Sequence, residues 1–449
     1  MATTDLKIYN GLTWDTPSQI SVFDSNTSSF VNATNVFVYT GGVWTQVWPS
    51  QTINTETIIV PDFILTGGTS GGDIYFANLQ YNTWSKMAGP SAGNGHTITN
   101  TQRDGGALIL AHSNSVSVYS DVQGLAANTT AFDPPTLERT HTISSVNIND
   151  HCRTYVSGGG VFSYGAYLAC DNGTIVKIDR LWNSATDYYP TTAELIANGQ
   201  ITTTSLGIGN NINAFAYALE DSIYSNPGLT NLVGVGDNGT VVFGTTSNPF
   251  APGYSFPSNA SYVGEYGIFN IGNTNKLLTT THMTITGAGY GLYAVAGESG
   301  EFGFLSYNTS TQQLSYIQQD LSGLGITGSI NKLISVKTAS YQSLISGAGV
   351  GDNGTFFFVT EDANVYSYSV AIADNFTSIS FIWDIVGNYI VYDFFLGGEY
   401  GTTERIQIVL DLTQPNPFAT MNVVMVNYNN PLRSPTWTSV QRYVPHSGQ

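Results

Sequence analysis

The amino-acid sequence predicts an all-β protein: a seven-bladed β-propeller preceded by a small N-terminal β-hairpin module. Three observations lead to this fold class. Charged residues make up only 10% of the 449 residues, while Gly, Thr, Ser, Asn and Tyr are plentiful, which favours strands and turns over helices. A strand–turn–strand pattern recurs along most of the chain. The first fifty residues follow a different pattern of short aromatic hairpins.

The recurrent pattern is most complete in VGVGDNGTVVFG, which runs from Val233 to Gly244. Gly239 can adopt the positive φ that a tight hairpin needs, Asn238 tolerates the left-handed region, and Asp237 can accept bonds from nearby amides. These residues predict a type I turn followed by a bulge. Phosphate-binding loops lead into a helix and carry a cation, whereas here a strand follows. We therefore predict a structural turn.

Seven copies of this pattern, some of them degenerate, occur at intervals of 43 to 66 residues. Their turns are Gly71-Gly72, Ser113-Asn114-Ser115, Asp171-Asn172-Gly173, Asp237-Asn238-Gly239, Ser299-Gly300, Asp352-Asn353-Gly354 and Gly398. Such a period suits a four-stranded antiparallel sheet with loops of uneven length. A single sheet of this kind cannot bury both faces, whereas seven arranged radially bury each face on a neighbour. The long period favours a propeller over a sandwich.

Other segments fit between these hairpins. YNTWSKM (81–87) and LSYIQQD (314–320) alternate enough to form outer strands. The apolar stretch 381–398 contains acidic residues and a Gly-Asn turn, so it predicts two strands and not a membrane span. Residues 191–199 break the β pattern, because a threonine precedes Glu194 by three positions and an Asn-Gly pair follows. This segment predicts one or two helical turns.

The N-terminal module, residues 1–49, contains three stretches in which two aromatic residues flank a turn. These pairs are Tyr9 with Trp14, Phe23 with Phe30, and Tyr39 with Trp44. Aromatic pairs across a hairpin contribute roughly 0.2–1 kcal/mol each. So small a fold needs association with a partner to be stable. Residues 50–57 are the predicted linker, and residues 58–449 are the predicted propeller.

The balance of charge excludes several partners. Thirteen Lys and Arg against 31 Asp and Glu give a formal net charge of −18, which repels nucleic acid and anionic lipid. We expect no nucleic-acid partner and no membrane insertion. The first residues, MATTDLKIYNGLTW, lack the charged and apolar regions of a secretory signal, so we expect assembly in the cytoplasm. Cys152 and Cys170 are expected to be small buried residues and not a disulfide.

A search for chemistry gives no catalytic, metal or cofactor prediction. The six histidines are His96, His112, His141, His151, His282 and His446, and none has metal-site spacing. Asn147–His151 offers alternating oxygen ligands but lacks the glycine and glutamate of a calcium loop, so a turn is the preferred interpretation. A sialidase-like mechanism needs an arginine cluster that grips a substrate carboxylate, and Arg103, Arg139 and Arg153 lie in one region of the chain. Surface ion pairs explain these three arginines equally well.

The remaining clue is aromatic. With 27 Tyr and 22 Phe, most rings must pack in the blades, but tyrosine also provides rigid contact area for sugars and protein surfaces. Two stretches are candidates for such a surface: residues 187–190, which read Asp-Tyr-Tyr-Pro, and residues 253–267, which read GYSFPSNASYVGEYG. Packing remains the preferred interpretation for any single ring.

The repeats IYNGLTW and VFVYTGGVWTQVWP resemble the N-terminal modules of tail and fibre proteins of tailed bacteriophages. The VGDNGT turn is similar to the blade hairpin of several bacterial propeller families. The chain departs from the WD, kelch and sialidase signatures. The resemblance implies a virion protein anchored by its N-terminal module, whose docking residues would be Tyr9, Trp14, Tyr39, Trp44 and Trp48.

We therefore expect a structural or host-recognition protein of a phage virion: a tail-fibre, tail-tip or receptor-binding component. Its expected partners are other virion proteins, a host-surface glycan or protein, and further copies of itself. Two alternatives stay open. One is a capsid decoration or head-fibre protein, and the other is a virion glycan hydrolase, whose paired carboxylates would come from distant parts of the chain and leave no local motif.

Overall fold

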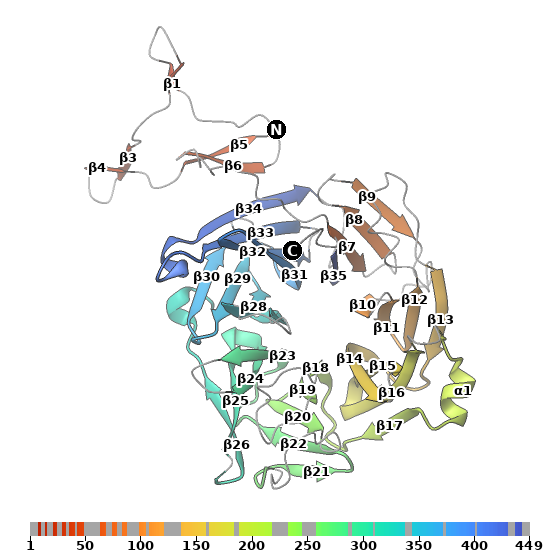
Figure 1. Ribbon diagram of the computed structural model, residues 1–449. Helices are drawn as coiled ribbons and strands as arrows, with labels where there is room; N and C mark the ends of the chain where they lie inside the picture. Colours follow the sequence, from red (N-terminus) through yellow and green to blue (C-terminus); the bar gives the residue numbers. More distant parts are fainter. Residues whose placement is uncertain are drawn as a thin grey trace. The chain divides into compact units, whose positions relative to one another are not determined.

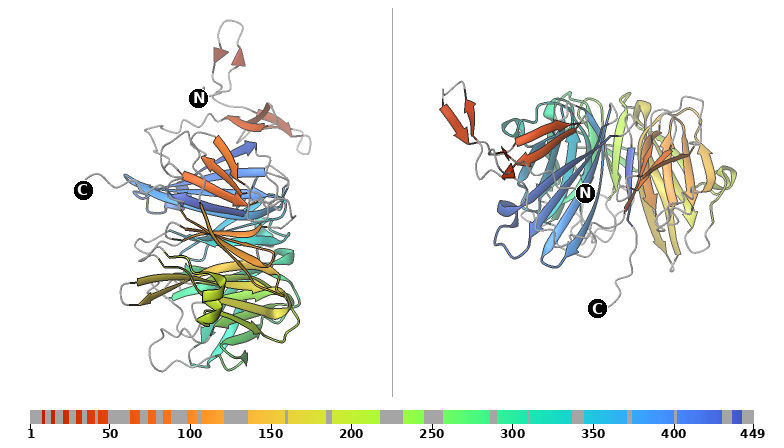
Figure 2. Two further views of the ribbon diagram at one scale, coloured as in Figure 1. Left: turned by 90° about the vertical axis from the view of Figure 1, so that its right-hand side faces the viewer. Right: turned by 90° about the horizontal axis from the view of Figure 1, so that it is seen from above.

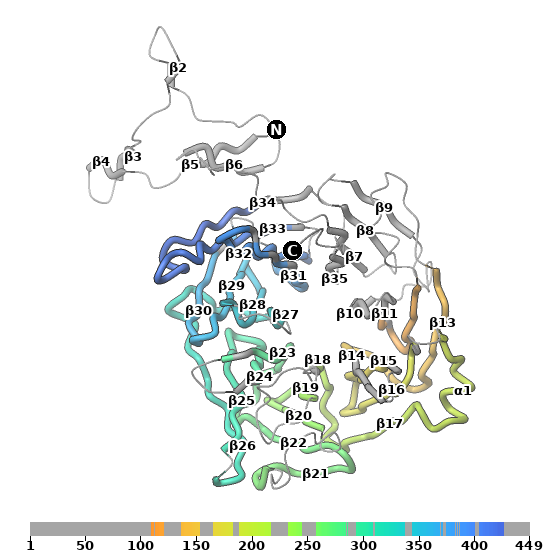
Figure 3. The backbone as a smooth tube through the Cα atoms, viewed as in Figure 1, coloured from red at the N-terminus to blue at the C-terminus, as the bar shows by residue number. Residues whose placement is uncertain are grey.

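The computed structural model divides the chain into two compact units, residues 1–60 and 61–449. It describes residues 8–9, 14–15, 21–24, 29–32, 36–40, 43–48, 63–68, 74–78, 83–87, 98–104, 107–120, 136–158, 161–183, 188–217, 232–244, 257–285, 290–308, 310–336, 344–370, 374–399, 402–429 and 436–441. Side chains are described for most of these residues between 109 and 425. Figure 3 traces the backbone in the same view as Figure 1, coloured along the sequence.

The first unit contains three two-stranded hairpins. They are β1 (Ile8–Tyr9) with β2 (Trp14–Asp15), β3 (Ser21–Asp24) with β4 (Ser29–Asn32), and β5 (Val36–Thr40) with β6 (Val43–Trp48). The register places Tyr9 opposite Trp14, Phe23 opposite Phe30, and Tyr39 opposite Trp44. The predicted linker, residues 50–57, lies outside the described residues.

The second unit is a ring of seven antiparallel sheets, numbered here as blades 1 to 7 (Figure 1). Blade 1 is β35 (Thr436–Gln441), β7 (Phe63–Gly68), β8 (Ile74–Asn78) and β9 (Thr83–Met87); blade 2 is β10 (Ile98–Asp104), β11 (Ala107–His112), β12 (Ser115–Ser120) and β13 (Thr136–Thr142); blade 3 is β14 (Ile148–Gly158), β15 (Val161–Cys170), β16 (Thr174–Asn183) and β17 (Ile201–Ser205). Blade 4 is β18 (Ile212–Tyr217), β19 (Leu232–Gly236), β20 (Thr240–Gly244), β22 (Tyr266–Asn270) and β21 (Ser261–Val263); blade 5 is β23 (Leu277–Ile285), β24 (Tyr290–Gly297), β25 (Phe302–Asn308) and β26 (Gln313–Gln318). Blade 6 is β27 (Ile330–Ser335), β28 (Ile345–Gly351), β29 (Thr355–Thr360) and β30 (Val365–Ser369); blade 7 is β31 (Phe376–Val386), β32 (Tyr389–Gly398), β33 (Thr402–Asp411) and β34 (Asn422–Asn429).

The seven inner strands close a circle. Each first strand contacts the first strand of the next blade, in the cycle β35, β10, β14, β18, β23, β27, β31 and back to β35. In the side view of Figure 2, the strands of this unit run broadly along the ring axis. The second unit is therefore a seven-bladed β-propeller, and the fold class predicted from the sequence is confirmed.

The ring closes through a strand from the far end of the sequence. β35 pairs with β7, from Thr436 opposite Gly68 to Gln441 opposite Phe63. Blade 1 thus takes its inner strand from the end of the chain and its other three strands from the beginning of the second unit. β35 therefore covers the inner edge of β7 and ties the two ends of the ring together.

The recurrent hairpin is the central strand pair of every blade. The seven copies correspond to β7/β8, β11/β12, β15/β16, β19/β20, β24/β25, β28/β29 and β32/β33. At the best copy, Asn238 and Gly239 have φ of 55° and 65°, and the Thr240 amide donates to the Asp237 carbonyl at 3.2 Å. Positive φ at both central residues makes this a type I′ turn, so the predicted type I turn with a bulge is wrong. The type I′ turn matches the right-handed twist of the flanking strands.

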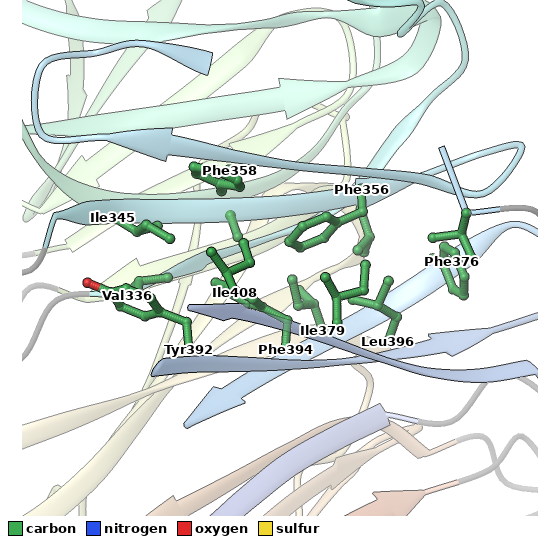
Figure 4. Close-up of a cluster of buried hydrophobic side chains, with 14 of the residues drawn as sticks. Val336, Ile345, Phe356, Phe358, Phe376, Ile379, Tyr392, Phe394, Leu396 and Ile408 are labelled. Atoms are coloured by element: carbon green, nitrogen blue, oxygen red, sulfur yellow. The ribbon is translucent and has the colours of Figure 1, made fainter. Parts of the chain in front are cut away.

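Apolar side chains fill the space between neighbouring blades. Strands β19, β20 and β28 are buried at every position, because both faces of these sheets pack on a neighbour. Between blades 6 and 7, the rings of Phe356 and Phe394 lie 5.2 Å apart (Figure 4). Tyr392, Leu396 and Ile408 from blade 7 meet the same cluster.

Helical structure in the described chain is short. The α-helix α1 (Thr192–Ala197) lies between β16 and β17, and the Thr191 hydroxyl accepts the Glu194 amide while the Glu194 carboxylate accepts the Thr191 amide. This capping box confirms the helical turn predicted there. Short 3₁₀ segments are η2 (Asp171–Gly173), η4 (Glu298–Gly300), η5 (Ser322–Leu324) and η6 (Pro417–Thr420). No described helix is long and apolar enough to cross a membrane.

Candidate functional site

The Asp-Asn-Gly turns contact the neighbouring blade through an asparagine. In blade 4, Asn213 occupies a β-bulge at the start of β18. Its amide nitrogen donates to Asp237 Oδ1 at 3.0 Å, and also to the Leu277 carbonyl of blade 5 at 2.7 Å. One side chain therefore joins the turn of its own blade to the backbone of the next blade.

Two further blades repeat this contact, which we call the asparagine staple. In blade 3, Asn149 donates to Asp171 Oδ1 at 3.0 Å and to the Ile212 carbonyl of blade 4 at 2.9 Å. In blade 6, Asn331 donates to Asp352 Oδ1 and to the Phe376 carbonyl of blade 7, both at 3.0 Å. The staple asparagines are Asn149, Asn213 and Asn331. The aspartates of the Asp-Asn-Gly turns accept these hydrogen bonds. The turns therefore have a structural role, because they hold the asparagines that connect neighbouring blades.

The turns also pack closely on the next blade. Gly173, Gly239 and Gly354 are buried, whereas the asparagines before them, Asn172, Asn238 and Asn353, are exposed. A Cβ at Gly239 would lie 2.6 Å from the Asn273 carbonyl, and the φ of Gly239 is +65°. Glycine is therefore required there by both the backbone conformation and the close approach.

Removing a staple should weaken the ring. In Asn213→Ala, Asp237 and the Leu277 carbonyl each lose a donor, so we expect the free energy of unfolding to fall by about 1–3 kcal/mol. Urea titration followed by tryptophan fluorescence measures this loss. Asn364→Ala is the matched control, because Asn364 is exposed on a hairpin of blade 6 and should change stability by less than about 0.5 kcal/mol. Equal effects of the two variants would contradict the staple.

A carboxylate and an ammonium group meet inside the ring. Asp150 on β14 of blade 3 lies 3.4 Å from Nζ of Lys332 on β27 of blade 6, so the pair joins two blades that are not neighbours. The Phe215 amide of blade 4 donates to Asp150 Oδ2 at 3.3 Å. Burial raises the pKa of Asp150, and the charge of Lys332 partly offsets this shift. This ion pair links inner strands from separate parts of the ring.

The titratable groups beside this pair are held neutral. Burial, with a smaller contribution from Lys332, lowers the pKa of His151 to about 3. Burial raises the pKa of the Cys152 thiol well above its ordinary value and that of Cys170 to about 12. Both cysteines are free and buried, which confirms the sequence prediction. A thiol that stays protonated is a poor nucleophile, so neither supports thiol chemistry.

The predicted alternatives at Asn147–His151 are both corrected. Asn147 directly precedes β14, and residues 148–151 begin this strand with a bulge, so the segment forms neither a turn nor a calcium loop. Asn147 and Asn149 donate to Asp171, whereas Asp150 lies against Lys332, so the side chains do not converge on one point. Among the residues that the structure describes, no group of three or more His, Cys, Asp or Glu side chains is placed to hold a metal ion.

The three arginines that the sequence places in one region of the chain do not all lie on inner strands of the propeller. Arg103 is on β10 and Arg153 on β14, both inner strands, whereas Arg139 is on β13, the outer strand of blade 2. Three strand spacings of about 4.8 Å separate β10 from β13, which puts the backbones of Arg103 and Arg139 about 14 Å apart. This placement gives no support to a carboxylate-gripping triad.

Within the part of the chain that the structure describes, each predicted aromatic surface has one exposed and one buried tyrosine. Tyr188 is 46% exposed and donates to Glu194 at 2.6 Å, whereas Tyr189 is buried and stacks on Trp182 with ring centroids 6.2 Å apart. That bond and those from Thr191 lower the pKa of Glu194 to about 2, so this surface carries a negative charge at neutral pH.

The second stretch behaves in the same way. Tyr262 is 42% exposed, and its hydroxyl donates to the Pro257 carbonyl at 2.6 Å, whereas Tyr266 is buried. The edge-to-face contact of Tyr262 with Phe243 fixes the ring against the blade. Rigid, partly exposed tyrosines offer contact area at little entropic cost. Tyr188 and Tyr262 are therefore the described aromatic residues of these two stretches that are available for binding.

The N-terminal docking residues lie in the hairpins of the first unit. Tyr9, Trp14, Tyr39 and Trp44 face their partners across β1/β2 and β5/β6, and Trp48 pairs with Val36 at the open end of the third hairpin. Their side chains lie outside the described residues. The backbone register therefore brings the aromatic positions together in pairs within each hairpin.

The staple asparagines were not found from the sequence, although a signal is present. Each follows an isoleucine, in Ile148-Asn149, Ile212-Asn213 and Ile330-Asn331, and precedes its Asp-Asn-Gly turn by 21 to 24 residues. Asp150 and Lys332 have no such signal, since 182 positions separate them.

Comparisons with known proteins give structural likeness only. No family model matches the sequence, and no curated protein sequence matches it. Sqt1 of Saccharomyces cerevisiae is similar in structure, with a TM-score of 0.43 and 13% identity over 75% of this chain and 79% of that chain. The WD40 domain of Neurospora crassa Pan2 gives 0.43 and 7% over 74% and 82%. BBS1N, solved in complex with ARL6DN, gives 0.42 and 10% over 74% and 84%.

Proposed function

We propose that this protein is a structural and host-recognition component of a phage virion, without enzymatic activity. Residues 1–49 attach it to the particle, and the propeller is displayed for binding to a host-surface glycan or protein. The observation that carries the proposal is the division into two compact units, the first of which is built from small hairpins with paired aromatic positions. Such hairpins have little core of their own and gain stability from association.

The chemistry of the described residues supports a scaffold role. The carboxylates of the Asp-Asn-Gly turns accept bonds from the staple asparagines, and the Asp150 carboxylate lies against Lys332. Groups that would serve as nucleophile or base, such as Cys152 and His151, are buried and held neutral by their surroundings. A closed ring with such interior contacts is a rigid scaffold, and binding residues are often carried by loops on a rigid scaffold.

The exposed tyrosines mark the proposed contact surface. Tyr188 and Tyr262 are each anchored by a hydrogen bond while nearly half of the residue stays accessible. Tyrosine combines an apolar ring with a polar tip, which suits both sugar and protein partners. The negative charge of Glu194 beside Tyr188 favours a neutral or cationic partner at that place.

Deleting residues 1–49 tests the attachment role. We expect the truncated protein to remain folded, because the second unit contains the closed ring, and to be absent from purified particles of the phage that encodes it. Circular dichroism measures folding, and quantitative mass spectrometry of particles measures incorporation. Tyr188→Ala in the full chain is the matched control, which should enter particles normally and reduce adsorption to host cells.

Three results would contradict the proposal. Incorporation of the truncated protein at the normal level would remove the attachment role. Loss of host-polysaccharide viscosity on addition of the purified protein would show an enzyme. A copy number that matches the capsid lattice and not the tail would identify a decoration protein.

A further inference from the structure

The outer strand of blade 7 has an unusually long free edge. β34 contains eight residues, whereas the outer strands of the other six blades contain three to seven. β34 pairs with β33 on one side, and no described segment pairs with its other side. A free edge presents unpaired amides and carbonyls, so it is a template for a further strand.

This edge lacks the features that usually prevent such pairing. β34 reads Asn-Val-Val-Met-Val-Asn-Tyr-Asn and contains no charge and no proline. The uncharged run extends from Leu412 to Leu432, in a chain whose net charge is −18. By contrast, β13 on the edge of blade 2 carries Glu138 and Arg139. A second copy of so acidic a protein would meet least repulsion along a surface of this kind.

Packing fixes the strand while its middle remains accessible. Val423 packs against the core cluster between blades 6 and 7, and β33 pairs with all eight residues of β34. Met425 is 37% exposed. The backbone of this edge is therefore held in place before any partner arrives, which reduces the entropy lost on pairing.

The sequence of β34 is compatible with itself. In a two-fold symmetric antiparallel pair, one residue lies opposite its own copy and the residues on either side exchange partners. Val424-Met425-Val426 reads the same in both directions, so a pair centred on Met425 sets Met425 against Met425 and each Val424 against Val426. Cross-strand pairs of β-branched residues are among those that stabilise sheets.

We propose that β34 pairs antiparallel with β34 of a second copy, in the register centred on Met425. The two copies of blade 7 then form one continuous eight-stranded sheet, with the two-fold axis between the Met425 residues. This dimer rests on the edge of blade 7 alone, so it stands independently of the proposed role in a virion.

Charge exchange at Met425 tests the dimer in the full chain. Analytical ultracentrifugation of the wild-type protein should show a dimer. Met425→Glu and Met425→Lys each place like charges opposite one another, so each variant alone should dimerise at least about tenfold more weakly. An equimolar mixture of the two should restore the dimer, because each Glu then faces a Lys. Ile317→Glu is the matched control, since Ile317 is 47% exposed on the outer strand β26, and it should leave the dimer unchanged.

A cysteine at the same position tests the register. Opposed residues of an antiparallel pair have Cα atoms about 4.5–5.5 Å apart, within the range of a disulfide. Met425→Cys should therefore give a disulfide-linked dimer under mild oxidation, whereas Ile317→Cys should not. The native cysteines are buried, so the wild-type protein should give none.

Several outcomes would overturn the dimer. These are a monomeric wild-type protein, wild-type association of Met425→Glu, a mixture of the two charge variants that stays monomeric, or equal crosslinking of the two cysteine variants. Circular dichroism of Met425→Glu should match the wild type. If Met425→Glu loses structure, the crosslinking of Met425→Cys decides whether the dimer forms.

Discussion

Lys332→Met is expected to lower the free energy of unfolding by about 3 kcal/mol at neutral pH. Asp150 is almost fully buried, and its carboxylate lies against Lys332 inside the ring. Methionine fills a similar volume but removes a positive charge that compensates this carboxylate. A buried charge that loses its counter-charge costs more than the pair itself contributes. Urea titration at pH about 7 measures the loss.

The partner variants distinguish the ion pair from simple packing. Asp150→Asn should cost less, because the Lys332 side chain is 29% exposed and can still reach water. The double variant Lys332→Met with Asp150→Asn should be more stable than the sum of the single losses predicts. The cost of Lys332→Met should also shrink in acid, because burial raises the pKa of Asp150 and lets the folded protein neutralise it. Additive losses that do not vary with pH would contradict this account.

The second large effect is a loss of stability in mild acid. Burial lowers the pKa of His141 to about 4 and that of His151 to about 3, from an ordinary value of 6.5. Between the folded pKa of each histidine and pH about 6.5, the unfolded chain binds a proton that the folded chain does not. The free energy of unfolding is therefore highest above pH about 6.5 and falls below it. At pH about 5 each histidine should have removed about 2 kcal/mol, which is 1.5 pKa units at about 1.4 kcal/mol each.

Single replacements isolate these contributions. Asp150 acts in the opposite direction, because its raised pKa lets the folded protein take up a proton first. The contribution of Asp150 is the same in the wild-type protein, in His141→Gln and in His151→Gln. Comparing the pH dependence of their unfolding free energies therefore isolates each histidine. Each variant should reduce the stability difference between pH about 7.5 and pH about 5 by about 2 kcal/mol, whatever its own stability at neutral pH. If the pH dependence of both variants equals that of the wild type, the histidines are not the cause.

Local chemistry made much of the fold predictable. The Asp-Asn-Gly turn and the alternation around it depend on neighbouring residues, so all seven central hairpins could be located from the sequence. The capping box at Thr191 and Glu194 is likewise contained within four residues. The turn type was wrong, because the twist of the paired strands selects the type I′ form and the residue types alone permit both.

Contacts between distant positions were not predictable in this way. The pairing of β35 with β7 joins opposite ends of the second unit, and no residue pattern in either strand marks the other as its partner. The ion pair of Asp150 with Lys332 has the same character, since it exists only after two separate blades take their places in the ring. The staple asparagines are intermediate: their spacing repeats in the sequence, but the carbonyl that each one binds belongs to the following blade.

The late position of β35 has a consequence for synthesis on the ribosome. Until residues 436–441 have left the exit tunnel, β7 lacks its inner neighbour. Blade 1 then has three of its four strands, whereas all the strands of the other six blades have already been synthesised. Such long-range pairing makes the last step slow and leaves strand edges open in the meantime. The ring is therefore completed only after residues 436–441 have been synthesised.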